Sequence, residues 1–170
     1  MGREPMWQRE FFPNVSSRAQ VEDFGTNFTN PDQQGVVCDM IVRLLATSGI
    51  NAENIGVICM NSAAAKKLRN ELREALPNGT ALPQVSSFDA FIGQERDIMI
   101  VCTVASFELS VTRLHPFGFI REPERLNVAV TRAKRFSFYV ADISLWRSQK
   151  EILGKREIKD SKEDDQCDPM

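Results

Sequence analysis

The sequence is poor in the residues that build metal sites and disulfide frameworks. Its four cysteines are scattered without a C-x-x-C pair, and His115 is its one histidine. Cys59 and Cys102 lie inside apolar runs, where a free thiol behaves as a small hydrophobic side chain. We therefore expect no disulfide framework and no structural metal. This cysteine usage favours a reducing compartment, either cytoplasmic or nuclear.

Long hydrophobic runs and an excess of positive charge are also missing. No apolar stretch approaches the ~20 residues that a membrane-spanning helix needs, and no signal peptide is recognisable. We therefore predict no membrane partner. The formal net charge is -2, so no global basic field attracts nucleic acid, and any such contact must come from a local patch.

The motifs that hold a nucleotide triphosphate are absent as well. The chain has no G-x-x-x-x-G-K-[ST] and no acidic magnesium-binding motif. Without a phosphate cradle and a metal ligand, ATP cannot be held for hydrolysis. Any ATP chemistry would therefore require a second domain that supplies both.

What the sequence does contain is an alternation of apolar strands and amphipathic helices. The pattern predicts strands over 55–59, 84–87, 97–104 and 136–142. It predicts a helix over 34–47 that Gly49 closes, and a second helix that Asn61 or Ser62 caps and that continues to Leu76. Such alternation is typical of an α/β domain whose mainly parallel sheet is covered on both faces. Residues 1–150 form this one domain, and the charged residues 151–170 are expected to be a disordered tail.

One stretch, GFIREPERLNVAVTRAKR, carries two arginines at a suggestive spacing. Pro123 favours the start of a helix. On that helix Arg125 and Arg132 would share a face, because seven residues make two turns. A guanidinium offers a fork of donors suited to phosphate oxygens. The alternative interpretation is a solvated basic helix end beside the last helical carbonyls.

A second stretch, SFDAFIGQERD, follows the strand predicted over 84–87, and ligand sites in parallel sheets sit at the carboxyl ends of strands. Gly93 permits close approach of the backbone to a ligand. Glu95 offers a carboxylate to ribose hydroxyls. Taken alone, the pair also fits a turn glycine followed by a solvated acid.

Together, SFDAFIGQERDIMIVCTV and GFIREPERLNVAVTRAKR closely resemble motifs V and VI of superfamily-one helicases. The match is to the branch that contains the nonsense-mediated-decay helicase. Pro5-Met6-Trp7 resembles the strand that opens that family's second RecA-like domain. GTNFTNPDQ resembles its G-x-S-x-x-N segment, with Asn27 or Asn30 as the polar marker, and IGVICMNSAAAKKLRNEL resembles motif IV. The resemblance implies a RecA-like three-layer α/β sandwich.

The family's functions can be transferred to matching positions. The resemblance implies that Arg132 is an arginine finger at the γ-phosphate and that Arg125 supports the same phosphate. Nucleotide contacts would come from Glu95, Gly93 and Asn61. Nucleic-acid contacts would come from three residues near motif V: Ser87, Asp89 and Thr103. ATP and magnesium would bind only in complex with a P-loop domain.

This sequence departs from the family at three positions. Ile92 stands where the family has glutamine in F-Q-G. Asn61 stands near the tyrosine of motif IV that stacks on a base, and Ala105 stands where an arginine often follows the strand of motif V. Each change removes a donor or a stacking surface, and stacking contributes about 1–3 kcal/mol per base. We therefore expect the chain alone to bind single strands weakly.

Two hypotheses remain open at this stage. The first is the second RecA-like half of an ATP-dependent RNA or DNA helicase, which is inactive without a first RecA-like domain in cis or in trans. The second is a degenerate helicase domain that serves as a protein-interaction scaffold in an RNA-processing or RNA-silencing complex. A P-loop partner favours the first hypothesis.

Overall fold

The computed structural model describes residues 9–22, 27–105 and 131–144. Eleven elements lie in these ranges, and their bounds follow in chain order: β1 Arg9–Phe11, β2 Gln20–Glu22, β3 Asn27–Thr29, α1 Pro31–Leu45, η1 Ala52–Asn54, β4 Ile55–Cys59, α2 Ser62–Ala75, β5 Gln84–Ser87, η2 Phe88–Phe91, β6 Arg96–Cys102 and β7 Ala133–Val140. The short strands at the start of the chain follow no strong hydrophobic pattern. Pro5-Met6-Trp7 lies outside the described residues, and β1 is the first described strand.

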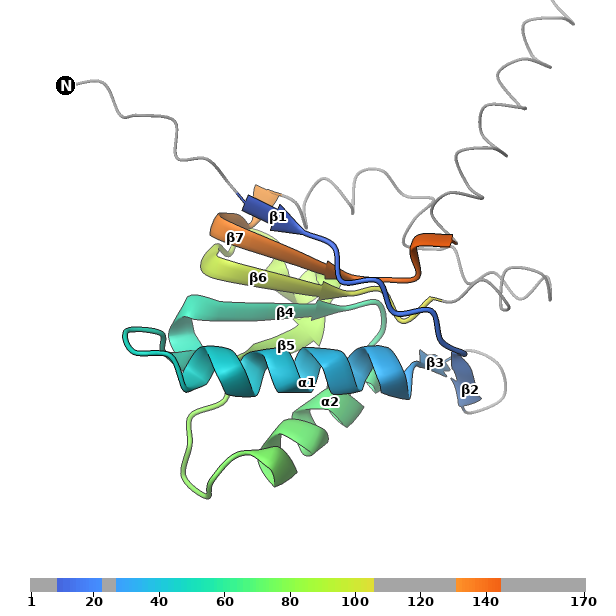
Figure 1. Ribbon diagram of the computed structural model, residues 1–170, viewed down its shortest axis with the longest axis horizontal. Coiled ribbons are helices and arrows are strands. Elements are labelled where there is room, and N and C mark those ends of the chain that lie inside the picture. Colours follow the sequence, from blue (N-terminus) through green and yellow to red (C-terminus); the bar gives the residue numbers. More distant parts are fainter. Residues whose placement is uncertain (1–8, 23–26, 106–130, 145–170) are drawn as a thin grey trace, which may run out of the picture.

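The centre of the fold is a five-stranded sheet in the order β1-β7-β6-β4-β5 (Figure 1). All four neighbouring pairs are parallel. β2 and β3 form a separate antiparallel pair. The expected α/β fold with a parallel sheet is confirmed, and β6 and β7 are inner strands. It agrees with the RecA-like sandwich that the resemblance implies.

The strand predicted over 136–142 begins earlier, at Ala133. Its first residues include Lys134 and Arg135, both exposed. Polar side chains at the solvated beginning of a strand give no hydrophobic signal, so the pattern alone missed them. The strand predicted over 97–104 likewise begins at Arg96 and ends at Cys102.

The helix predicted over 34–47 is shifted towards the N-terminus. Asn30 caps α1 by accepting a hydrogen bond from the Gln33 backbone N–H at 3.2 Å, and Pro31 occupies the first turn. Such a start suits proline, which has no N–H to satisfy. The helix is capped by Ala46, so Gly49, with φ +86°, belongs to the turn that follows and does not close the helix.

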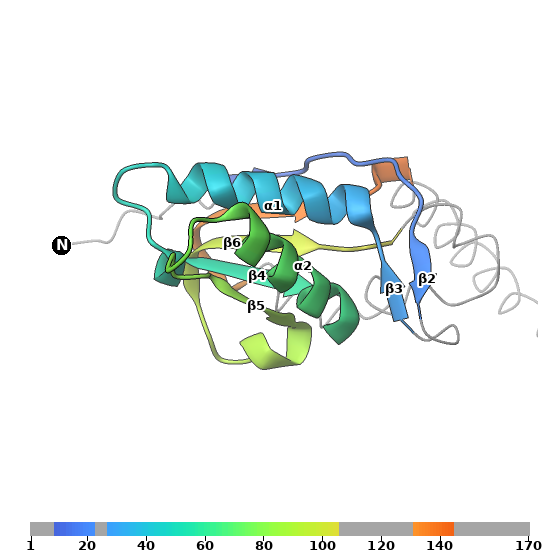
Figure 2. The same cartoon turned by 90° about the horizontal axis from the view of Figure 1, so that it is seen from below.

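Both described helices cover one face of the sheet. One core cluster joins Val37 and Ile41 of α1 and Leu68 and Leu72 of α2 to alternate residues of β4 and β6 such as Ile100. The opposite face carries a second cluster, to which η2 contributes Phe88 and Phe91. Figure 2 shows α1 and η2 on opposite sides of the sheet. The helix predicted from Pro123 and the tail over 151–170 lie outside the described residues.

Candidate nucleotide and nucleic-acid site

The predicted site residues divide between the two ends of the parallel strands. Three of them follow the carboxyl ends of strands: Asn61 after β4, Ser87 at the end of β5 and Thr103 after β6. Three more precede the amino ends of strands: Gly93 and Glu95 before β6, and Arg132 before β7. The expectation that Gly93 and Glu95 sit at carboxyl ends is therefore wrong. The division leaves two candidate sites. We call the one at the amino ends of the strands the amino edge, and the one at their carboxyl ends the carboxyl edge.

At the amino edge, a tight turn presents Gly93 and Glu95. Phe91 is fully buried and anchors the start of the turn, and its carbonyl accepts from the Gln94 N–H at 3.1 Å. The Gln94 side chain donates to the Ala90 carbonyl at 2.8 Å. Gly93 has φ +77° and open space where a side chain would stand, so its backbone can be approached closely. Glu95 is exposed.

Arg96 connects this turn to the rest of the edge. Its Nη1 donates to the Glu95 carbonyl at 2.9 Å, and its Nη2 donates to Gln84 Oε1 at 2.7 Å and to Gln94 Oε1 at 3.1 Å. Its backbone N–H donates to the Arg132 carbonyl at 3.0 Å. Arg96 is thus bonded on both sides, to the turn of Glu95 and to Arg132. Sequence reasoning missed it, because one more charged residue in a charged loop carries no signal.

A glycine in the neighbouring strand leaves room for the Arg96 stem. A Cβ on Gly56 of β4 would lie 3.0 Å from Arg96 Cγ, 2.6 Å from Met99 Sδ and 2.9 Å from Phe91 Cε1. The stem of Arg96 therefore lies against β4 at Gly56, and its guanidinium reaches Gln84 on β5 beyond it. Gly56 is needed here for the close approach of side chains from β6 and η2.

Arg132 lies in the turn that leads into β7. It follows the last helical residue, Thr131, and is half-buried. Its Nη2 lies 3.4 Å from Thr131 Oγ1. The amino edge therefore brings together Arg132, Glu95 and Gly93. Arg125, the other predicted catalytic arginine, lies outside the described residues.

The carboxyl edge is built over a buried network of amides. Asn30 and Gln33 are fully buried, and they reach the chain that leaves β6. Asn30 Nδ2 donates to the Val104 carbonyl at 3.4 Å, and Gln33 Nε2 donates to the Ala105 carbonyl at 3.0 Å. Buried Gln34 donates to the Ala64 carbonyl at 3.1 Å. The network thus ties the first turns of α1 and α2 to residues 103–105.

The network holds a strained backbone. Val104 has φ 60°, a left-handed conformation that costs an L-residue roughly 1–2 kcal/mol and is uncommon for a β-branched side chain. Thr103 is 1% exposed, and its hydroxyl lies 3.3 Å from the Val140 carbonyl and 3.4 Å from Gln33 Oε1. The Thr103 side chain is therefore buried beneath the surface of the carboxyl edge. Its predicted contact with nucleic acid stays a prediction.

Asn61 caps α2, as one of the two residues expected to do so. Its Oδ1 accepts from the Ala64 N–H at 2.8 Å, and its Nδ2 donates to the Phe28 carbonyl at 2.7 Å. The side chain is therefore engaged in structure at the carboxyl edge, away from Glu95. Ser87 is half-buried at the end of β5, and Asp89 lies in η2.

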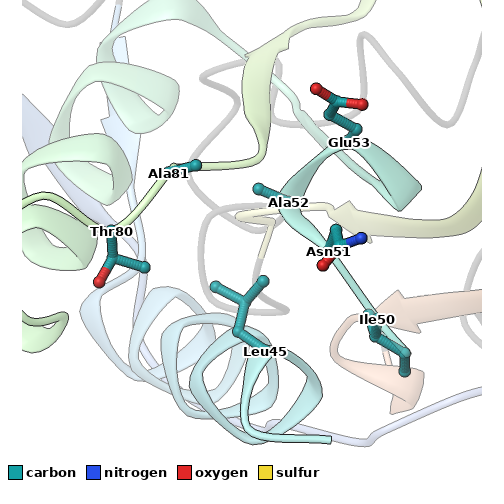
Figure 3. A pocket seen from close by; sticks show the side chains of 7 residues that line it. All are labelled: Leu45, Ile50, Asn51, Ala52, Glu53, Thr80 and Ala81. Carbon is teal, nitrogen blue, oxygen red and sulfur yellow. The ribbon is translucent and has the colours of Figure 1, made fainter. Parts of the chain in front are cut away.

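A concavity of about 430 Å³ lies elsewhere, between the end of α1, η1 and the segment that leads to β5 (Figure 3). Leu45 and Ile50 supply its apolar lining, and Asn51, Glu53 and Thr80 its polar lining. It contains none of the predicted site residues. Within the described ranges, no group of three His, Cys, Asp or Glu is placed to hold a metal, and no helix is long and apolar enough to cross a membrane.

A family model described as an AAA domain, AAA_12, matches residues 3–161. The chain is 32% identical over 127 residues to Regulator of nonsense transcripts 1 of Caenorhabditis elegans, which covers 73% of this chain and 11% of that protein. It is 34% identical over 142 residues to the mouse 5'-3' DNA helicase ZGRF1, an alignment that covers 82% of this chain and 7% of that protein. It is 32% identical over 120 residues to the ATP-dependent helicase NAM7 of Saccharomyces cerevisiae, an alignment that covers 69% of this chain and 12% of that protein.

These similarities confirm the resemblance to the superfamily-one helicase branch that contains the nonsense-mediated-decay helicase. The chain spans about a tenth of the length of each of these relatives. Activities of the whole relatives therefore come to this chain only by proposal.

Proposed function

The chain belongs to this AAA domain family, and from that premise we propose that it is the second RecA-like half of an ATP-dependent RNA or DNA helicase. In this proposal, the first RecA-like domain supplies the phosphate cradle and the magnesium ligands that the sequence lacks. The observation that carries the proposal is the amino edge, where Arg96 bonds to the turn of Glu95 and to Arg132. Residues far apart in the sequence meet there in an arrangement that suits a nucleotide.

Several features of the described residues support the proposal of a nucleotide at the amino edge. Gly93 leaves its backbone open, as a ligand approaching closely requires. The exposed Glu95 carboxylate can accept hydrogen bonds from ribose hydroxyls. We assign the γ-phosphate to Arg132, whose fork suits phosphate oxygens. ATP with magnesium would place its developing negative charge against that guanidinium, and the family resemblance adds Arg125 to the same role.

We propose that single-stranded nucleic acid binds at the carboxyl edge, with Ser87 and Asp89 near the nucleic-acid backbone. Thr103 supports this surface from within, because its hydroxyl belongs to the buried network. The strained, amide-held loop after β6 supports the proposal, since strained backbone persists where the surroundings over-determine it and clusters at functional sites. Binding by the chain alone is expected to be weak and strongly dependent on salt.

A scaffold role is the second candidate, and one observation favours it. Ile92 is 66% exposed at the tip of the amino-edge turn, where the family has glutamine. Isoleucine in place of glutamine exchanges a polar side chain for one whose burial against another protein is favourable.

A chimera separates the two candidate functions. We would replace the matching segment of yeast NAM7 with this chain and measure ATP hydrolysis in the presence of single-stranded RNA. Arg132→Ala is expected to lower kcat by roughly 10³-fold or more with little change in ATP binding, because an arginine finger acts in the transition state. Lys134→Ala, an exposed neighbour, is the matched control. An active chimera that is indifferent to Arg132→Ala would refute the motor proposal, and an inactive one that still binds a partner protein supports the scaffold.

A further inference from the structure

We propose that Arg96 is a positioning residue for nucleotide binding, which holds the Gly93–Glu95 turn in its binding conformation through Gln84 and Gln94. This inference rests on the proposed function of the amino edge. It adds a residue outside the contacts that the family resemblance implies. Arg96 need not touch the nucleotide, because its side chain is bonded to three oxygens of the protein.

The geometry of these bonds requires an arginine. One guanidinium nitrogen binds the backbone oxygen of Glu95, while the other bridges the side-chain oxygens of Gln84 and Gln94. A guanidinium presents its donors in a rigid plane and can fix several acceptors at once, whereas a lysine ammonium is a point charge on a flexible stem. We call these three hydrogen bonds of the Arg96 side chain, to Glu95, Gln84 and Gln94, the clamp. Arg96→Lys would retain the charge but lose part of the clamp.

Gln84 provides the fixed point of this clamp. It is the first residue of β5, and β4 separates it from β6 in the sheet. The guanidinium crosses β4 at Gly56, where a side chain would collide with the Arg96 stem. The turn before β6 is thereby tied to a strand that takes no part in the proposed nucleotide contacts. A change at Gln84 should therefore reach the nucleotide only through Arg96.

The clamp acts on one side of the site through side chains and on the other through the backbone. The bond from Arg96 to Arg132 uses the backbone N–H, which substitution leaves in place. Loss of the Arg96 side chain should therefore free the turn of Glu95 while the strand pairing beside Arg132 persists. The predicted signature is weaker ATP binding with nearly unchanged chemistry, because positioning of a bound group depends on its supporting shell.

The test uses the NAM7 chimera described above, with ATP KM and kcat measured at saturating single-stranded RNA. Arg96→Ala and Gln84→Ala should each raise KM by roughly tenfold, which corresponds to about 1.4 kcal/mol of binding free energy, and should change kcat by less than about threefold. The double variant should be no worse than Arg96→Ala alone, and Arg96→Lys should recover part of the loss. Arg73→Ala, which removes an exposed guanidinium bonded to Asn70, should leave KM unchanged.

A second measurement does not depend on activity. Hydrogen–deuterium exchange of the full chain should show faster exchange across residues 92–96 in Gln84→Ala, with the rest of the sheet unchanged. Unchanged exchange there, or an unchanged KM in folded Gln84→Ala, would overturn the inference. Failure of Arg132→Ala to affect kcat refutes the proposed function, whereas unchanged exchange in Gln84→Ala refutes the clamp. If Arg96→Ala does not fold, Gln84→Ala decides the question by itself.

Discussion

Two glycine-to-alanine substitutions should change the stability of this domain in opposite directions. At Gly56, an added methyl group would stand 2.6 Å from Met99 Sδ and 2.9 Å from Phe91 Cε1. Both of these side chains are fully buried in the cluster on that face of the sheet. At Gly35, within α1, nothing lies within 4 Å of the added methyl group. The same chemical change therefore meets a packed core at one position and solvent at the other.

The expected sizes follow from these environments. Overpacking a well-packed core costs typically about 1–3 kcal/mol. Gly56→Ala should fall in this range, because the fully buried side chains of Met99 and Phe91 must both shift to admit the methyl group. Alanine inside an exposed helix is favoured over glycine by roughly 0.5–1 kcal/mol. Gly35→Ala should therefore stabilise by that amount, and the two variants should differ by about 1.5–4 kcal/mol.

Urea unfolding followed by circular dichroism measures both changes on the same scale. The midpoint should fall for Gly56→Ala and rise for Gly35→Ala, with similar slopes if the denatured state is unchanged. A neutral or stabilising Gly56→Ala would show that the packing between β4, η2 and β6 is loose. That result would also weaken the case for an Arg96 stem held against β4.

Three further outcomes follow from particular side chains. Asn61→Ala should destabilise by about 0.5–2 kcal/mol through loss of the α2 cap, whereas Ser62→Ala, exposed in the first turn, should change the unfolding midpoint little; equal effects would contradict the cap. Burial raises the pKa of Glu71, so ionisation costs the folded state more than the unfolded state. Glu71→Gln should therefore stabilise at pH 7, and the gain should vanish below about pH 4, where both states of the wild type are protonated; a larger gain in acid would contradict this. A hydrogen bond with Cys102 and burial raise the pKa of the Cys59 thiol, so iodoacetamide should not label Cys59 until urea unfolds the protein, and rapid labelling of Cys59 in buffer would refute this expectation.

The framework of the fold was predictable because its strands and helices bury whole faces. β4 and β5 match the predicted ranges residue for residue, and α2 begins at the predicted cap. The ends of elements were less predictable. Pro31 starts α1 earlier than its apolar pattern suggests, and Lys134 lies in a strand although it is exposed. Helix capping and the exposure of residues at the ends of strands decide such boundaries, and hydrophobic periodicity records neither.

The buried amides show a different limit of sequence reasoning. Gln33 and Gln34 lie on α1 in a sequence position that reads as polar and solvated, yet both are fully buried. Their partners, the carbonyls of Ala105 and Ala64, lie 72 and 30 residues away. Buried polar groups are almost always hydrogen-bonded, but a single sequence does not identify a backbone acceptor at that separation. The strain at Val104 is hidden for the same reason.

The location of Glu95 follows from the direction of the chain through motif V. Ser87 ends β5 at the carboxyl edge, and Arg96 begins β6 at the amino edge. Because β6 runs parallel to the strands beside it, the connection must return along the whole length of the sheet, which for a strand of seven residues is roughly 23 Å. η2 covers the core on this path, so the serine of the motif and its glutamate lie at opposite edges. The amino-edge placement departs from the general rule that ligands of open α/β sheets bind at the carboxyl ends of strands. Under the proposed function, a second domain holds most of the nucleotide, and Glu95 and Arg132 would meet it from the amino edge.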